Sequence, residues 1–210
     1  MIVEESVKRR RFKRPAIFAD TTNYGQLGVR DLKKKLRDLD IFPVVVETFS
    51  IGDKDMAAQV ARAKEAGADV ISTYGIDSEL AQIANAMGKL GWKVPMIGSW
   101  TLSTTSFIDG AGTNGNGAMM PQTFFEIPDT VRRKAFIDAY RASFRVDRIA
   151  SPVAAVQGYD SVYLLAAAVS QAGSTTTRPS LPTSQFSALS KMVASSQLTL
   201  PTLPATRRSV

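Results

Sequence analysis

Short apolar runs alternate along the chain with longer segments in which apolar residues recur every three or four positions. The short runs are typical of buried β-strands, and the longer segments are typical of amphipathic helices. We expect strands at 15–19, 43–49, 69–74 and 94–98, and a fifth strand entered from a glycine-rich loop at 112–120. We expect helices at 24–39, 53–66, 78–90, 128–144 and 151–172. The alternation predicts the α/β fold class, with a parallel, doubly wound sheet built from right-handed crossovers.

The first predicted strand runs directly into a polar loop. Its apolar residues stop at Asp20, two threonines and an asparagine follow, and a helical pattern begins near Gln26. In open α/β sheets, ligands bind in the crevice outside the carboxyl ends of the strands, which is where this loop falls. The loop carries hydrogen-bonding groups and one exposed aromatic ring, but no obvious catalytic base. We therefore expect a ligand contact here.

The composition excludes several kinds of chemistry. The chain has 210 residues and contains neither histidine nor cysteine. This excludes thiol and imidazole nucleophiles, disulfides, Cys/His zinc sites and the Ser-His-Asp triad, although a carboxylate site for Mg²⁺ or Ca²⁺ stays possible. No nucleophile, base and orienting group can be assembled, so we expect neither an enzyme nor a cofactor. No apolar run approaches the roughly 18–20 residues that span a bilayer, so we expect no membrane insertion.

The net charge of +7 is concentrated near the start of the chain, in the run from Lys8 to Arg14. Such a run can bind nucleic acid or anionic lipid, or it can be the solvated end of a helix or a linker. We favour the second interpretation and expect no nucleic-acid partner, because no basic groove with interleaved aromatic residues follows. The first residues do not form a secretory signal, since their charges follow the apolar residues and no apolar core segment is present.

The character of the sequence changes after Gly173. Residues 174–210 include eight serines, seven threonines and four prolines, and no acidic residue or glycine. Too little apolar area is available there to offset the entropy of ordering, so we expect mostly disorder. The predicted organisation is a basic segment at 1–14, an α/β lobe at 15–173 and a disordered tail at 174–210.

Five motifs occur in an order and spacing that resemble a known family: AIFADTTNYGQLG at 16–28, GDKDMAAQVARAKEAGADVI at 52–71, GKLGWKVPMIGSW at 88–100, the helix from Pro128 through Tyr140, and AAVQGYDSVYLLAAAVSQAG at 154–173. Together they resemble the second lobe of type 1 periplasmic binding proteins, in the branched-chain amino-acid subfamily of ABC-transporter substrate-binding proteins. The resemblance implies a non-catalytic, periplasmic component that binds an amino acid or a related small organic solute and meets an ABC permease.

The chain departs from this family in two ways. It begins where the first lobe of such proteins ends, and the family pattern is lost after Gly173. A truncated gene with a shifted reading frame at its 3′ end would produce both features, so we expect a fragment. A fragment without a signal peptide would stay in the cytoplasm, and half a cleft would bind solute weakly or undetectably.

The resemblance implies ligand contacts in the first loop. Tyr24 lies where family members place an aromatic ring from the second lobe against the ligand, although a tyrosine at a helix start can also pack locally. Asn23 and Thr22 could donate or accept hydrogen bonds with the solute.

Two later loops are expected to face the same crevice. Tyr74 and Asp77 follow the third strand, and Asp77 could either contact the ligand or cap the next helix. Trp100 follows the fourth strand, at a position where amino-acid-binding members tend to have an acidic residue. A tryptophan there offers stacking area and argues against an ordinary branched-chain amino acid, or it simply covers the edge of the sheet.

Two other functions use the same class of fold. A regulatory or receptor-type ligand-sensing domain would share the lobe architecture, but no helix-turn-helix pattern precedes Pro15. A dinucleotide-binding enzyme would need G-x-G-x-x-G between a strand and a helix. The literal match at 110–115 instead follows a polar segment and precedes a strand-like one, so we interpret it as a flexible loop.

Overall fold

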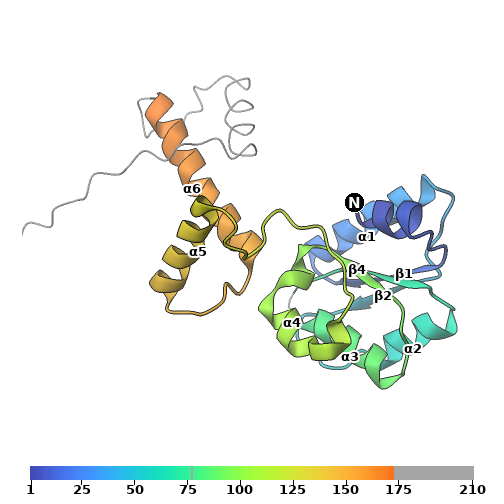
Figure 1. Ribbon diagram of the computed structural model, residues 1–210. Coiled ribbons are helices and arrows are strands. Elements are labelled where there is room, and N and C mark those ends of the chain that lie inside the picture. The colour runs from blue at the N-terminus through green and yellow to red at the C-terminus, as the bar shows by residue number, and fades with distance from the viewer. Residues whose placement is uncertain (77, 173–210) are drawn as a thin grey trace, which may run out of the picture. The chain divides into compact units, whose positions relative to one another are not determined.

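The computed structural model describes residues 1–76 and 78–172 (Figure 1). Contacts divide the chain into two compact units, with the division between Val153 and Ala154. Asp77 and the predicted tail at 174–210 lie outside the described residues.

A four-stranded parallel sheet forms the centre of the first unit. Its strands are β1 (Pro15–Asp20), β2 (Val45–Phe49), β3 (Val70–Tyr74) and β4 (Met96–Gly98), in the spatial order β2-β1-β3-β4. All three pairings are parallel. The four strands predicted from apolar runs are confirmed, and so is the α/β fold class.

The fifth predicted strand is wrong. Within the described chain, pairing beyond β4 is limited to an isolated bridge between Ile97 and Met119. Gly117 has a φ of 84°, outside the extended range, and Pro121 has no N–H to donate. These residues flank the bridge on both sides and prevent a longer ladder.

The five predicted helices are all present. They are α1 (Asn23–Arg37), α2 (Ala57–Glu65), α3 (Glu79–Lys89), α5 (Val131–Phe144) and α6 (Pro152–Ala172). The helix α2 begins later than predicted, and the Asp55 carboxylate accepts a hydrogen bond from the Ala57 N–H at 2.9 Å. Four further elements were not predicted: η1 (Glu4–Arg9), η2 (Trp100–Ser103), α4 (Thr105–Ala111) and η3 (Gly112–Gly115). The G-x-G-x-x-G match at 110–115 thus lies on the end of α4 and on η3, so the flexible loop predicted there is wrong.

The central strand β1 is buried on both faces. Ile17 and Ala19 point into a cluster with α1 and η1, whereas Ala16 and Phe18 point into a cluster with α2, α3 and α4. Figure 1 shows the same arrangement, with α1 on one side of the sheet and α2, α3 and α4 on the other. Helices on both faces explain why these strands are apolar throughout.

The basic segment at the start of the chain is part of this packing. Val3, the N-cap of η1, is 8% exposed and joins the cluster around Ile17. The charged side chains lie on the outside, where Glu5 pairs with Arg9 and with Arg10. The run behaves as the solvated end of a helix, which is the interpretation favoured from the sequence.

Among the described helices, α6 is long and apolar enough to cross a membrane, judged by length and composition alone. The segment is Pro152–Ser170, and 6% of it is buried. This corrects the prediction that no segment of the chain meets that test. The reason is that its many alanines lengthen an apolar stretch in which Asp160 is the only charged residue.

Candidate functional site

The crevice lies at the carboxyl ends of β1 and β3, where the strand order reverses. The chain leaves β1 for α1 on one face of the sheet and leaves β3 for α3 on the other. The two loops therefore separate at this point and leave an opening, which is where open α/β sheets bind ligands.

A buried carboxylate joins the two loops. Asp20 is fully buried at the end of β1. Its Oδ1 accepts hydrogen bonds from the N–H and the hydroxyl of Thr22, and its Oδ2 accepts one from the Ile76 N–H at 3.1 Å. Sequence reasoning did not assign a role to Asp20. The signal was available, because a carboxylate that ends a fully apolar strand must find donors to be buried.

Thr22, one of the candidate ligand contacts in the first loop, has a structural role. Thr22 is the N-cap of α1, and its Oγ1 accepts a hydrogen bond from the Gly25 N–H at 3.4 Å. The same hydroxyl donates to Asp20, so its proton is not free for a solute. Asn23, the first residue of α1, is exposed.

Tyr24 and Tyr74 form an aromatic pair across the crevice. Their ring centroids are 4.8 Å apart with an interplanar angle of 45°, and both side chains are half-buried. Burial raises the pKa of Tyr24, a hydrogen bond with Ser99 opposes this effect in part, and the neighbouring Tyr74 and Asp20 raise the pKa further. The phenol is therefore neutral at physiological pH, and the pair offers an apolar surface with polar tips.

The loop after β4 completes this edge of the sheet. Ser99 and Thr101 share a hydrogen bond of 2.7 Å, and the Thr101 hydroxyl donates to the Gly75 carbonyl at 2.8 Å. Trp100, between them, is half-buried at the start of η2. The loops after β1, β3 and β4 are thus linked by hydrogen bonds into one rim.

A cavity of about 480 Å³ opens beside this rim. Its lining includes Tyr74, Ser99 and Trp100 together with Leu32 of α1. Thr22, Asn23 and Tyr24 are not among the described residues that line it. The structure therefore brings Tyr74 and Trp100 to one cavity. Tyr24 does not line this cavity but packs against the ring of Tyr74, which does.

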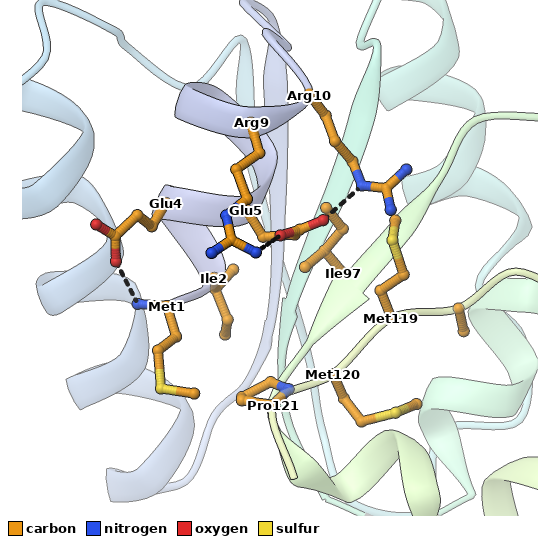
Figure 2. Close-up of a pocket in the computed structure, with 11 residues that line it drawn as sticks. Met1, Ile2, Glu4, Glu5, Arg9, Arg10, Ile97, Met119, Met120 and Pro121 are labelled. Carbon is orange, nitrogen blue, oxygen red and sulfur yellow. Dashed lines mark hydrogen bonds and ion pairs between the residues drawn. The ribbon is translucent and has the colours of Figure 1, made fainter.

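A second cavity, of about 500 Å³, lies between η1 and the edge of β4. Figure 2 shows Glu5 between Arg9 and Arg10 on one side, and Ile97 and Met119 on the other. Of the residues predicted from the sequence to bind ligand, none that the structure describes lies on it. Within residues 1–76 and 78–172, no group of three or more acidic residues could hold a metal ion.

A parallel sheet with an aromatic crevice at its switch point is an arrangement in which α/β proteins bind small molecules. Comparison with known proteins identifies the family to which this chain belongs. The family model described as "Periplasmic binding protein" matches residues 2–196. The chain belongs to the periplasmic binding protein family, a class of non-catalytic binding proteins. The match extends past Gly173, so the resemblance reaches further along the chain than predicted.

Curated relatives and solved structures agree with this membership. Leu/Ile/Val-binding protein homolog 3 of Brucella melitensis is 28% identical over 170 residues, which are 80% of this chain and 45% of that protein. A type 1 periplasmic binding protein of Bordetella pertussis superposes with a TM-score of 0.70 at 26% identity, covering 90% of this chain and 52% of that one. The branched-chain amino acid transporter substrate-binding protein of Streptococcus pneumoniae, solved with isoleucine, gives a TM-score of 0.62 at 26% identity, covering 80% and 47%. The chain spans about half the length of the relatives that it matches.

Proposed function

We propose that this chain supplies one solute-binding lobe of an ABC-transporter substrate-binding protein, and that its solute is an amino acid or a related small organic molecule. The observation that carries the proposal is the Tyr24–Tyr74 pair at the carboxyl edge of the sheet, with Trp100 beside it. Membership of the family and the names of the relatives support it. An ABC permease as partner and the periplasm as location are part of the same proposal.

The proposed ligand contacts are Thr22, Asn23, Tyr24, Tyr74, Asp77 and Trp100. In this proposal the aromatic rings stack on an apolar or flat part of the solute, and the exposed Asn23 side chain hydrogen-bonds its edge. Thr22 would act there only as an acceptor, because its hydroxyl donates to Asp20. Asp77, outside the described residues, is proposed as a contact on its place in the sequence alone.

The aromatic wall favours a solute with an apolar or flat group over one recognised chiefly by its ammonium group. Asp20 is fully buried and its carboxylate accepts hydrogen bonds from Thr22 and Ile76, so it does not face a cation in the crevice. Trp100 and the two tyrosines instead present ring surface. We therefore infer that an ordinary branched-chain amino acid is not the best solute for this lobe.

Binding by the isolated chain is proposed to be weak. Hinge-type binding proteins gain affinity by closing two lobes around the solute, and one lobe supplies only part of the contacts. A dissociation constant near 1 mM corresponds to only about 4 kcal/mol of binding free energy. Micromolar binding of any amino acid in titration calorimetry would contradict this part of the proposal.

The test uses the two tryptophan indoles as reporters. Trp100 lies at the crevice, whereas Trp92 packs against the core cluster on the α3 face. In ¹⁵N-correlated NMR spectra, with the Trp92→Phe variant used for assignment, L-isoleucine, L-leucine and benzoate are each added to about 20 mM, well above a millimolar dissociation constant. We expect the Trp100 indole signal to shift in a saturable way with at least one of these probes, while the Trp92 signal stays in place.

The variant that tests the role of the aromatic pair is Tyr24→Ala, which removes one of its two rings. It should reduce the saturable shift of the Trp100 signal. The proposal fails if no probe moves the Trp100 signal, or if Tyr24→Ala leaves the shift unchanged.

A further inference from the structure

We propose that Gly28 is the positioning residue of the crevice: its missing side chain lets Tyr74 lie against α1 and so holds the Tyr74 ring on Tyr24. Nothing in the sequence pattern or in the comparisons gives Gly28 this role. The part of the inference that concerns solute affinity rests on the proposed function, whereas the part that concerns the ring pair does not.

The contact at Gly28 leaves no room for a methyl group. A Cβ placed on this buried glycine would lie 2.1 Å from Cγ, 2.2 Å from Cδ1 and 2.7 Å from Cβ of Tyr74. All three distances are shorter than any normal carbon–carbon contact. The backbone of Gly28 has ordinary helical geometry, so close approach and not conformational freedom explains the glycine.

Rotation of the Tyr74 ring would not relieve this overlap. The Cβ of Tyr74 is itself too close, and its position is fixed by the backbone of β3. That backbone is held by parallel pairing with Ala19 of β1. An alanine at position 28 therefore has to push α1 away from the sheet.

Tyr24 lies one turn before Gly28 on the same face of α1, since the two residues are four positions apart. A displacement of α1 thus carries Tyr24 away from Tyr74. The contact at Gly25 shows that this whole turn is seated closely, because a Cβ there would lie 2.2 Å from the Asp20 carbonyl oxygen. The overlap at Gly25 is with backbone, so Gly28 is the better position to test.

The experiment compares Gly28→Ala with Gly158→Ala. Gly158 is also within a helix, and nothing lies within 4 Å of a Cβ built there, so it controls for the effect of the methyl group on the helix itself. In NMR spectra of tyrosine-labelled protein without solute, we expect ring-to-ring NOEs between Tyr24 and Tyr74 in the wild type and in Gly158→Ala. We expect these NOEs to be lost in Gly28→Ala.

The second measurement is the shift of the Trp100 indole signal with benzoate. Loss of an aromatic contact of this kind corresponds to about five-fold weaker binding, so Gly28→Ala should need that much more benzoate for half-saturation. Gly158→Ala should titrate as the wild type does. If the NOEs vanish as expected but no variant binds any probe, the positioning role stands and the proposed function fails.

NOEs that persist in Gly28→Ala would overturn the inference, because the ring pair would then not depend on the glycine. A Gly28→Ala variant that does not fold is examined in combination with Tyr74→Gly, which removes the ring and all three close contacts, including the one to the Tyr74 Cβ. Recovery of folded protein in the double variant supports the inference. Failure to recover it would show that Tyr74 is not what Gly28 accommodates, and would also overturn the inference.

Discussion

Replacing Asp20 by alanine should destabilise the first unit and open the crevice. The carboxylate is fully buried and accepts hydrogen bonds from the Thr22 N–H, the Thr22 hydroxyl and the Ile76 N–H. Asp20→Ala leaves all three donors without their acceptor and removes the link between the loops after β1 and β3.

The structure sets the size of this effect. A buried donor left without a partner costs about 1–3 kcal/mol. Ile76 is 39% exposed and Thr22 is half-buried, so water can replace part of what is lost. We therefore expect Asp20→Ala to lower the free energy of unfolding by about 2–4 kcal/mol, which is near the low end of the summed cost of three unpaired donors. Asp20→Asn should cost about half as much, because its amide oxygen can still accept while its NH₂ group faces a donor.

Urea denaturation followed by circular dichroism measures this loss, with the midpoint and slope fitted separately. The matched control is Asp53→Ala, which removes an exposed carboxylate that accepts a hydrogen bond from the Ser50 N–H at 2.7 Å. If Asp20→Ala costs no more than Asp53→Ala, the carboxylate does not hold the two loops together and the reasoning is refuted.

Three further predictions concern charge and packing. Burial raises the pKa of Tyr24 above its ordinary value of 10.0. The contribution of the neutral phenol to stability is therefore complete below pH 10 and is lost as the pH rises through the folded-state pKa. Tyr24→Phe should flatten the fall of the urea midpoint above pH 10. Arg62→Ala should lower the urea midpoint, because the Arg62 guanidinium makes two hydrogen bonds, of 2.8 and 2.6 Å, to the buried Glu47 carboxylate. The double variant with Glu47→Ala should lower the midpoint less, because it leaves no buried charge unpaired. Leu36→Ala should cost about 2–4 kcal/mol in thermal or urea unfolding because this side chain is fully buried, and Leu27→Ala, at 40% exposure, should cost far less.

Periodicity predicted the main elements of the fold well. The runs around Ile17 and Ile71 are buried on both faces, so their apolar sequence marked them as strands. The short helix α4 was missed because its seven residues are too few to show a period. A local signal existed at Thr104, whose side chain accepts a hydrogen bond from the Phe107 N–H, as an N-cap does.

The candidate site was only partly predictable. The loops that carry Tyr24, Tyr74 and Trp100 could be placed at one edge of the sheet because the carboxyl ends of parallel strands lie at the same edge. The contact of Tyr74 with Gly28 could not, because it depends on how closely α1 approaches β3 after both have folded. A glycine inside a helical pattern gave the only hint, since such a residue weakens the helix and needs a reason.

The strand order also fixes when the crevice can form. The strand β1 pairs with β2 and with β3, and its register with β3 joins Ala19 to Tyr74, far apart along the chain. During synthesis the first loop therefore emerges long before its partner, and the bond from Ile76 to Asp20 has to wait for the third strand. The Ile76 amide hydrogen should consequently exchange with solvent as slowly as the amides of the β1–β3 ladder, because they open as one cooperative unit. It should not exchange at the rate of a surface loop. The crevice thus cannot form before the third strand has been made and has paired with β1.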